Sequence, residues 1–252
     1  MIKFENVTKS FGSKTILDNV SYEIKKGEIF CIVGPSGTGK SVSLKLMIRL
    51  LAPTSGRILI DGKCINEANN EELLGLRSRF GYLFQSSALL AWMNVYDNVA
   101  LPLREKTKLS EKEIGDRVRD ALDKVGLLHA LDVYPADLSG GMQKRAGLAR
   151  AIVTEPEILL YDEPTSGLDP VTSRKIDELI AGLSQKLGVT SVVVTHDMHS
   201  ALAIADRIGM LHSSRLLATT TPNEFIKSEI HEIKSFLDAQ YITKRGSWEK
   251  EL

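Results

Sequence analysis

The sequence predicts an α/β protein whose core is interrupted by an inserted helical subdomain. Short apolar runs recur along the 252 residues, and several are separated by stretches with the periodicity of amphipathic helices. Strands joined by helical crossovers give a mostly parallel sheet, which defines the α/β class. From about Val95 to Thr154 the pattern is helical, with charged residues interleaved with Leu and Val. No strand is expected in this stretch, so we assign it to the inserted subdomain.

The expected elements are short and bounded by turn-forming residues. Strands are expected at Ile29–Val33, Ile58–Ile60, Phe80–Phe84, Ile158–Tyr161 and Ser191–Thr195. The clearest helices are expected at Ser41–Leu51 and Pro170–Leu187. After Thr221-Pro222 we expect a short helix and a charged tail, Ser228 to Leu252, which is better explained as frayed than as a clasp on a partner subunit despite its Phe236-Leu237 pair and Trp248.

Composition excludes several classes of protein. Lys plus Arg and Asp plus Glu both number 32, so the net charge is +0, which argues against a broad nucleic-acid surface. No run approaches the roughly 18 apolar residues of a membrane span, and Met1 to Glu5 do not resemble a secretory signal. Cys31 lies in an apolar run and is expected to be a buried thiol. We therefore expect a cytosolic protein that reaches a membrane only through a partner.

A glycine-rich loop follows the strand Ile29–Val33 and precedes the helix expected from Ser41. It fits the pattern G-x-x-x-x-G-K-[ST] of phosphate-binding loops, in which backbone N–H groups and a helix N-terminus form an anion site. Lys40 is expected to bind the β- and γ-phosphates of ATP, and the Ser41 hydroxyl to bind Mg²⁺. The loop residues are Gly34, Pro35, Ser36, Gly37, Thr38, Gly39, Lys40 and Ser41.

A second candidate site lies at the end of the strand Ile158–Tyr161, where Asp162 and Glu163 follow directly. Ligands of parallel sheets bind at the carboxyl ends of the strands, and neighbouring strand residues point to opposite sides. Asp162 therefore suits Mg²⁺, and Glu163 suits the base or orienting group for an attacking water. Taken alone, this pair is also typical of a solvated strand end.

The segment Leu138-Ser139-Gly140-Gly141-Met142-Gln143-Lys144-Arg145 opens a helix that is expected to run to about Ile152. It resembles the signature motif of ABC (ATP-binding cassette) proteins, whose common form has Gln at the position of Met142. Ser139 suits a helix N-cap, and the glycines let a phosphate approach the exposed N–H groups. An ordinary capped helix is the alternative for this motif alone.

Further motifs follow in the order of the ABC family. Gln85, after Phe80–Phe84, resembles the Q-loop glutamine, and Asp169 closes a Ser-Gly-Leu-Asp segment that resembles the D-loop. His196, after Ser191–Thr195, resembles the switch histidine, and Phe11 resembles the aromatic residue that stacks on adenine. Each match is weak alone, because Phe11 also suits a core and His196 a structural role.

The resemblance implies a P-loop NTPase core of the RecA-like type with an antiparallel β-subdomain and an inserted helical subdomain. The implied parts are a nucleotide-binding core (1–86 and 155–221), a helical signature subdomain (87–154) and a C-terminal appendage (222–252). It also implies a head-to-tail homodimer in which Ser139 and Gly141 contact the γ-phosphate bound by the partner subunit. Glu163 would position water, His196 would contact the γ-phosphate, and Gln85 would sense Mg²⁺ and water.

The segment Ser86 to Glu105 resembles the corresponding part of the Mla/Mce lipid-transport ATPases, with its Phe-Gln-Ser-x-Ala-Leu and Asn-Val-x-x-Pro-Leu-Arg-Glu patterns. The resemblance implies an integral permease, an Mce-type lipid-binding protein, a small regulatory domain in some members, and a place on the cytoplasmic face of the inner membrane. The sequence departs from those proteins at Leu90-Ala91-Trp92. Leu89, Leu90, Trp92 and Met93 are candidates for an apolar patch that receives a permease helix, or else they pack the helical subdomain.

Two alternatives share the ATP chemistry. One is a transporter ATPase for another cargo, such as amino acids or a metal complex. The other is a single-cassette assembly factor without a permease. A GTPase is disfavoured, because the sequence contains no Asn-Lys-x-Asp guanine-reading segment.

Overall fold

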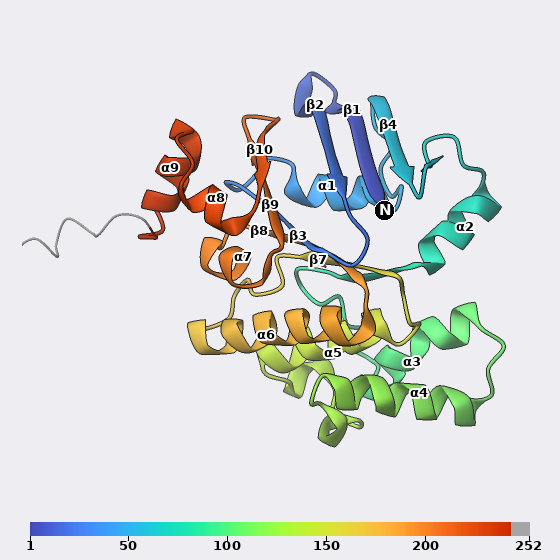
Figure 1. Cartoon of the computed structure of the whole chain (residues 1–252). Helices are drawn as coiled ribbons and strands as arrows, with labels where there is room; N and C mark the ends of the chain where they lie inside the picture. The colour runs from blue at the N-terminus through green and yellow to red at the C-terminus, as the bar shows by residue number, and fades with distance from the viewer. Residues whose placement is uncertain (243–252) are drawn as a thin grey trace, which may run out of the picture. The chain divides into compact units, whose positions relative to one another are not determined.

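The computed structural model describes residues 1–242, and the predicted contribution of Trp248 lies outside them. The chain divides into two compact units (Figure 1). The first unit comprises Met1–Asn69 and Val193–Leu252, and the second comprises Asn70–Val192.

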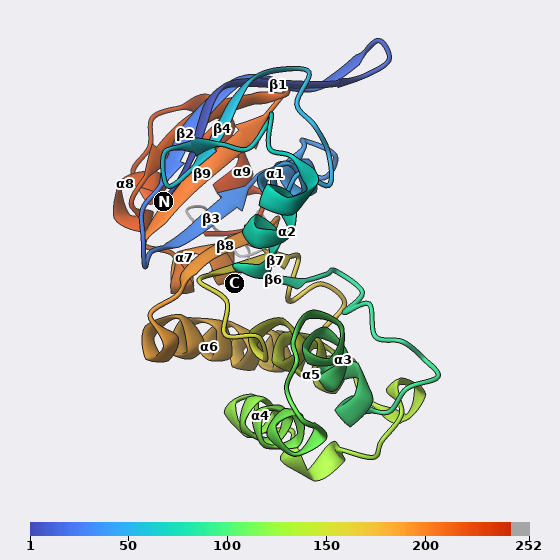
Figure 2. The ribbon, with the colours of Figure 1, turned by 90° about the vertical axis from the view of Figure 1, so that its right-hand side faces the viewer.

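One sheet of the first unit is antiparallel, as the resemblance implies, and its strands run in the order β2-β1-β4-β5. Figure 2 shows β1, β2 and β4 of this sheet. Alternate residues of β1, among them Ile2 and Phe4, are buried, as expected when one face of a sheet covers a core. The Phe4 ring stacks on Tyr22 of β2 with centroids 4.5 Å apart. The strands are β1 (Ile2–Phe11), β2 (Lys14–Ile24), β4 (Ser55–Ile60) and β5 (Lys63–Cys64).

The other sheet of the first unit has the strand order β10-β9-β3-β8. All five residues of β3 are buried, Cys31 among them, as is usual for a parallel strand covered on both faces. Strand β9 is parallel to β3, and β10 pairs with β9 in the antiparallel sense. The elements are β3 (Ile29–Val33), β8 (Thr190–Thr195), β9 (Arg207–His212) and β10 (Arg215–Thr220), with helices α1 (Lys40–Met47) and α7 (Met198–Ile204).

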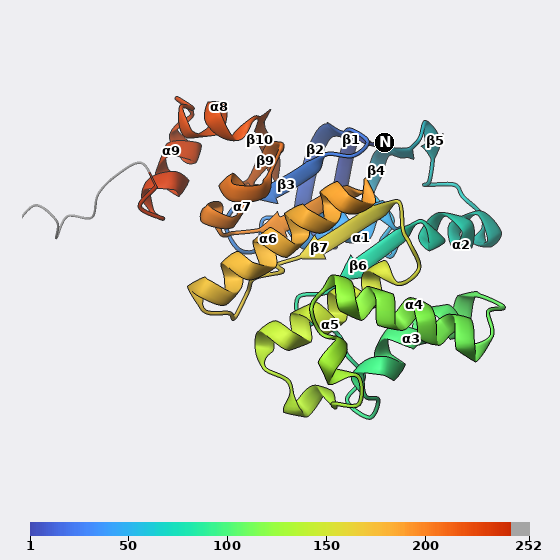
Figure 3. The ribbon, with the colours of Figure 1, turned by 60° about the horizontal axis from the view of Figure 1, so that its bottom comes forward.

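The second unit contains the strand order β8-β7-β6, and β8 belongs to both units because the boundary falls within it. Strands β7 and β6 are parallel, with Leu160 opposite Tyr82. Helices α3, α4 and α5 pack together, and α6 packs against α5 (Figure 3). The elements are α2 (Asn70–Ser78), β6 (Phe80–Leu83), α3 (Val95–Lys106), α4 (Glu111–Lys124), α5 (Gly140–Ile152), β7 (Ile158–Asp162) and α6 (Pro170–Leu187), with short 3₁₀ turns at Leu128–Ala130 and Pro135–Asp137.

Several element predictions are confirmed and some are wrong. Strand β3 and helix α6 have the predicted bounds, α5 ends at Ile152, and no strand interrupts residues 95–154. Helix α1 ends at Met47 and not at Leu51, because Arg49 adopts a left-handed φ of 49° that ends the helical backbone. The patterns did not identify β1, β2, β9 and β10.

The frayed tail is a second wrong expectation for the described part of the C-terminus. After α8 (Pro222–Ile226) the chain forms α9 (His231–Asp238), and Ile233 and Leu237 of this helix are buried. An apolar pair four residues apart lies on one helix face, which accounts for the docking of α9. Among residues 1–242, no helix has both the length and the apolar character that crossing a bilayer requires.

Candidate functional site

The glycine-rich loop of the first unit has a backbone that side chains would block. Gly34 has a φ of 145°, and a Cβ there would lie 2.1 Å from the carbonyl oxygen of Leu211. Gly39 has a φ of 99°, and its Cβ would lie 2.8 Å from the Leu17 side chain. Glycine tolerates both the left-handed backbone and the close approach, so these positions fix the loop's curvature.

Lys40 places its ammonium group inside this loop. Its Nζ donates to the carbonyl oxygens of Gly34 at 2.9 Å and Pro35 at 3.0 Å, and the side chain is buried. Helix α1 begins at Lys40 behind Gly39, and no side chain caps its N-terminus. The partial positive charge of the helix start and the lysine charge therefore act on the same loop, which is the arrangement expected of a phosphate site.

Phe11 and His196 are the other predicted site residues of the first unit. Phe11 ends β1 with 48% of its surface exposed, and Lys9 Nζ lies 4.8 Å from its ring centroid. This exposure excludes the core alternative for Phe11. His196 directly follows β8 and is exposed, and Asp197 caps helix α7 by accepting from the backbone N–H groups of His199 and Ser200. Both residues are therefore exposed at the surface of the first unit.

Asp162 is the last residue of β7 in the second unit and is buried. Its Oδ2 accepts a hydrogen bond from the hydroxyl of Tyr82, on the neighbouring strand β6, at 3.1 Å. Burial and the nearby Asp162 charge raise the pKa of Tyr82, so this phenol stays protonated and donates. The tyrosine thus fixes the orientation of the predicted metal-binding carboxylate, which excludes a freely solvated strand end.

Glu163 adopts a left-handed backbone with a φ of 50° and is also buried. Such a conformation is costly for a non-glycine residue and persists where its surroundings hold it. Lys144 of the signature helix α5 donates to the Glu163 carbonyl oxygen at 3.2 Å and also to the carbonyl oxygen of Gln85. Burial lowers the pKa of Lys144, and the charges of Glu163 and Asp162 oppose that shift. One buried ammonium therefore joins the backbones of two predicted site residues.

Gln85 begins a turn of residues 85–88, the Gln85 loop, which is held by α5 at further points. Arg150 donates to the carbonyl oxygens of Ser87 at 2.6 Å and Ala88 at 2.7 Å. Both of these residues have left-handed φ values, 60° and 48°. Gly147 allows the loop to approach, because a Cβ there would lie 3.1 Å from the Ser87 Cβ. The Gln85 side chain itself is exposed.

The signature motif forms the start of α5, as predicted. Ser139 is the N-cap and accepts from the Met142 N–H at 3.4 Å. Gly141 also serves packing, because a Cβ there would lie 2.6 Å from the Thr172 methyl group of α6. Asp169 caps α6 by accepting from Val171 and Thr172, and the Thr172 hydrogen bonds lower the pKa of Asp169.

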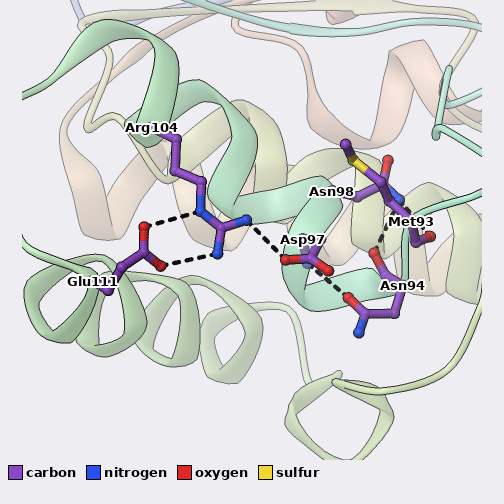
Figure 4. Close-up of polar contacts among 6 residues, drawn as sticks. All are labelled: Met93, Asn94, Asp97, Asn98, Arg104 and Glu111. Atoms are coloured by element: carbon purple, nitrogen blue, oxygen red, sulfur yellow. Dashed lines mark hydrogen bonds and ion pairs between the residues drawn. The ribbon is translucent and has the colours of Figure 1, made fainter.

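The segment between the Gln85 loop and α3 is held by one buried amide (Figure 4). Asn98 Oδ1 accepts from the Leu90 N–H at 2.7 Å, and its Nδ2 donates to the carbonyl oxygens of Leu90, Met93 and Asn94 at 2.9 to 3.1 Å. Trp92 lies on this segment with 73% of its surface exposed, while Leu89, Leu90 and Met93 are partly buried. The exposure of Trp92 excludes the alternative that this side chain packs the helical subdomain. It does not exclude that alternative for the other three residues.

Arg104 connects α3 to α4 near this segment (Figure 4). Its guanidinium donates to Asp97 Oδ1 at 2.8 Å and to both carboxylate oxygens of Glu111, at 3.2 and 2.9 Å. These charge-assisted bonds raise the pKa of Arg104 and lower that of Glu111. A bidentate pair fixes the angle between two helices better than a single contact does.

The predicted residues are divided between the units. The glycine-rich loop, Phe11 and His196 belong to the first unit, and the other predicted residues belong to the second. Within the second unit, Lys144 brings the backbones of Gln85 and Glu163 together. The motifs did not identify Tyr82, Lys144, Arg150 or Asn98. Asn98 and Arg104 lie within the Asn-Val-x-x-Pro-Leu-Arg-Glu pattern, but only their contacts reveal their roles.

Comparison with known proteins agrees with this geometry. The family model for ABC transporters matches residues 17–166. The chain is 44% identical over 249 residues to mkl of Mycobacterium leprae, described as a probable ribonucleotide transport ATP-binding protein, covering 99% of this chain and 72% of that one. It is 41% identical over 240 residues to the intermembrane phospholipid transport system ATP-binding protein MlaF of Haemophilus influenzae, covering 95% and 91%.

Solved structures confirm the fold class. A dimeric ATP-binding cassette in a post-hydrolysis state with ADP and Pi has a TM-score of 0.80 and 36% identity, covering 88% of this chain and 99% of that one. The cassette cbiO1 of Clostridium perfringens, part of an ABC transporter complex, has a TM-score of 0.83 and 31% identity, covering 95% and 94%. The chain therefore belongs to the ABC transporter family and is one of its ATP-binding and ATP-hydrolysing cassettes.

Proposed function

We propose that this cassette energises phospholipid transport through a separate integral permease, working as a homodimer at the cytoplasmic face of the inner membrane. The observation that supports the cargo is the 41% identity to MlaF over 95% of the chain. An Mce-type lipid-binding protein is the further partner, with a small regulatory domain as in some related systems. The functional parts are the core, 1–86 and 155–221, the helical part, 87–154, and the appendage, 222–252.

The chain's own residues account for the ATP chemistry. The glycine-rich loop and Lys40 bind the phosphates, and Phe11 stacks on the adenine. Glu163 orients water in line with the γ-phosphate, and His196 contacts that phosphate. The left-handed backbone of Glu163 and the Lys144 bond to its carbonyl support a fixed orientation for this carboxylate. Catalysis rests on positioning and on charge stabilisation.

The donor set fits Mg²⁺. This ion prefers oxygen ligands and usually takes one or two carboxylates together with substrate phosphates. The buried Asp162, which accepts from the Tyr82 hydroxyl, would supply a carboxylate, Ser41 a hydroxyl and Gln85 an amide oxygen. When bound, the ion would neutralise charge that develops on the β- and γ-phosphate oxygens.

The signature and D-loop act across the dimer in this proposal. Ser139, Gly140 and Gly141 contact the γ-phosphate held by the partner subunit, and Asp169 lies in the loop that follows Glu163. The dimeric state of a solved relative with ADP and Pi supports this arrangement. ATP then closes the dimer, and hydrolysis opens it.

The permease docks at the segment around Trp92. The exposed indole of Trp92 supplies an apolar contact, and the Asn98 hydrogen bonds hold the backbone of residues 90–94 beneath it. The partly buried Leu89, Leu90 and Met93 support that contact.

Substitutions test the ATP chemistry in the complete transporter. Glu163→Gln should retain ATP binding and lose nearly all turnover, because the amide no longer orients water as a carboxylate does. Lys40→Ala should lose ATP affinity, because the loop loses its lysine charge. Nucleotide binding and phosphate release are measured in parallel. Turnover at the wild-type rate by Glu163→Gln would remove this residue from its role.

Affinity purification in mild detergent, with mass spectrometry of proteins and lipids, tests the cargo. We expect a multi-span permease, an Mce-type protein and bound phospholipid, and ATPase activity that responds to phospholipid vesicles. The name of mkl, at 44% identity, makes ribonucleotide transport the second candidate. Stimulation by ribonucleotides other than ATP, and none by phospholipid, would favour it. If only soluble partners co-purify, the chain would still be an ATP-binding cassette, but its assignment to a transporter would be excluded.

A further inference from the structure

The C-terminal segment of the described chain, residues 222–242, is docked onto the first unit. Phe225 of α8 and Ile233 and Leu237 of α9 are buried, and α8 packs against β9. Tyr241 then adopts a left-handed φ of 55°, which ends the helical backbone, and the Gln240 N–H bonds the Leu237 carbonyl at 3.1 Å. The position of Gln240 is therefore fixed by both packing and backbone hydrogen bonds.

Gln240 bonds the backbone on both sides of Asp197, in the loop of residues 196–198, the His196 loop. Its Oε1 accepts from the Met198 N–H at 2.8 Å, and its Nε2 donates to the His196 carbonyl oxygen at 2.9 Å. The two bonds use the acceptor and the donor of one amide, and they span the residue that caps α7. Gln240, which lies 44 residues along the chain from His196, thus holds the backbone of the His196 loop.

The start of α7 explains why this contact matters. The first N–H groups of a helix have no partner within the helix. Asp197 accepts from His199 and Ser200, and its own N–H donates to the Thr195 hydroxyl. The Met198 N–H remains, and Gln240 accepts from it. The bonds of Asp197 and of Gln240 together hold the His196 loop from two directions.

The same segment also borders the phosphate loop. Helix α9 and Pro35 both line a cavity of about 470 Å³, together with Met210 and His212. The C-terminal segment therefore lies beside the glycine-rich loop as well as the His196 loop of the first unit.

We propose that Gln240 is a positioning residue of the ATPase, which fixes the backbone at His196 so that the imidazole meets the γ-phosphate in one orientation. The C-terminal segment thereby sets the rate of turnover. This inference rests on the proposed role of His196. A hydrogen bond between neutral groups contributes modestly, so the loss of both bonds should lower kcat by about threefold to tenfold. The KM for ATP should stay unchanged, because the phosphate loop and Phe11 are untouched.

Two substitutions of Gln240 distinguish the contributions of its two hydrogen bonds. Gln240→Met keeps the length of the side chain and removes both bonds. Gln240→Glu keeps the acceptor for the Met198 N–H but, when ionised, has no donor for the His196 carbonyl. Hydrogen exchange should show faster exchange of the Met198 amide in the Met variant and retained protection in the Glu variant. Lys234→Ala, which breaks an exposed ion pair of α9 with Glu229, is the matched control.

The deciding experiment measures kcat and KM of the complete transporter for Gln240→Met, His196→Ala and the double variant. If Gln240 acts through His196, the double variant should be no slower than His196→Ala alone. A wild-type kcat for Gln240→Met, together with a greatly reduced kcat for His196→Ala, would overturn the inference and leave the proposed function intact. An added loss in the double variant would also overturn it. A wild-type kcat for His196→Ala would instead remove the proposed role of His196, and the inference with it.

Discussion

The Gln85 loop and the His196 loop carry two residues of the proposed ATPase site, and the two loops are held by different chemistry. The Gln85 loop is bonded by two cations of the signature helix, Lys144 and Arg150. From the C-terminal segment, the neutral side-chain amide of Gln240 bonds the His196 loop. Lys144 and Arg150 are both pulled towards lower pKa values by burial, so the first arrangement carries a desolvation cost that the second lacks.

This difference in chemistry predicts how easily each loop can be displaced. Buried charge-assisted bonds are short and leave costly vacancies when a partner is removed, so the Gln85 loop is held tightly. Neutral bonds from a separately docked helix are weaker and are lost when that helix loosens. We therefore expect turnover to be more sensitive to changes in α5 than to changes in α9.

Lys144→Met should have the largest effect. It leaves the carbonyl oxygens of Gln85 and Glu163 without this donor and loosens the strained backbone of Glu163, the residue proposed to orient water. Misplacement of this kind should lower kcat by roughly tenfold to a hundredfold. The free energy of unfolding should fall by no more than about 1–3 kcal/mol, because the variant also removes a desolvated charge.

Steady-state ATPase kinetics and urea unfolding check this prediction. Arg145→Met is the matched control, since that neighbouring cation of α5 bonds the Gly126 carbonyl and not the Gln85 loop. Equal loss of kcat in both variants would mean that Lys144 acts only on the stability of the helix.

Gly147→Ala should have the next largest effect. Its methyl group would lie 2.9 Å from the Leu83 side chain and 3.1 Å from the Ser87 Cβ, so the Gln85 loop must shift. Overpacking of this kind costs about 1–3 kcal/mol, and we expect a severalfold loss of kcat. Hydrogen exchange at residues 85–88 measures the shift.

Gly182→Ala is the control for Gly147→Ala. Gly182 lies in helix α6 with no atom within 4 Å of the added methyl group. Alanine is the better helix former by about 0.5–1 kcal/mol, so this variant should gain stability. A similar loss of kcat in both would show that the close approach at Gly147 is irrelevant.

Leu237→Ala should have a smaller effect on turnover, and the structural change should be confined to the His196 loop. The buried leucine docks α9, and its truncation leaves a cavity that costs about 2–5 kcal/mol in local stability. The Met198 amide should exchange faster, kcat should fall modestly, and residues 85–88 should exchange as in the wild type. Ile226→Ala, at a more exposed position of α8, should change none of these. Faster exchange at residues 85–88 in the Leu237 variant would contradict the independence of the loops.

Acid should produce the smallest effect and should spare the neutral Gln240 contact. The pKa of Asp169 is lowered by its Thr172 bonds, so its stabilising effect is present above the unfolded pKa of about 3.9. That effect is lost as the pH falls through the lowered folded pKa. Asp169→Asn keeps an acceptor oxygen at the cap without this titration. Urea unfolding between neutral pH and about pH 3 should therefore show a shallower acid loss in the variant, and equal slopes would contradict the role of this cap.

The sequence alone determined the motifs, because each requires particular residue types at fixed spacing. Lys40 and its glycines, Asp162 and Glu163, and the Ser139 cap of α5 all follow from rules that hold within a few residues. The buried strand β3 was predictable for the same local reason, since continuous apolar residues suit a strand covered on both faces.

Only the tertiary structure decided how the motif backbones are held. Lys144 and Glu163 are 19 residues apart, Lys144 and Gln85 are 59 apart, and Gln240 and His196 are 44 apart. No local pattern encodes such pairs, because a lysine on a helix, or a glutamine just after one, is equally consistent with solvated surface. Lys144 is buried and Gln240 is partly buried, so the fold decides which carbonyl oxygens accept from their side chains.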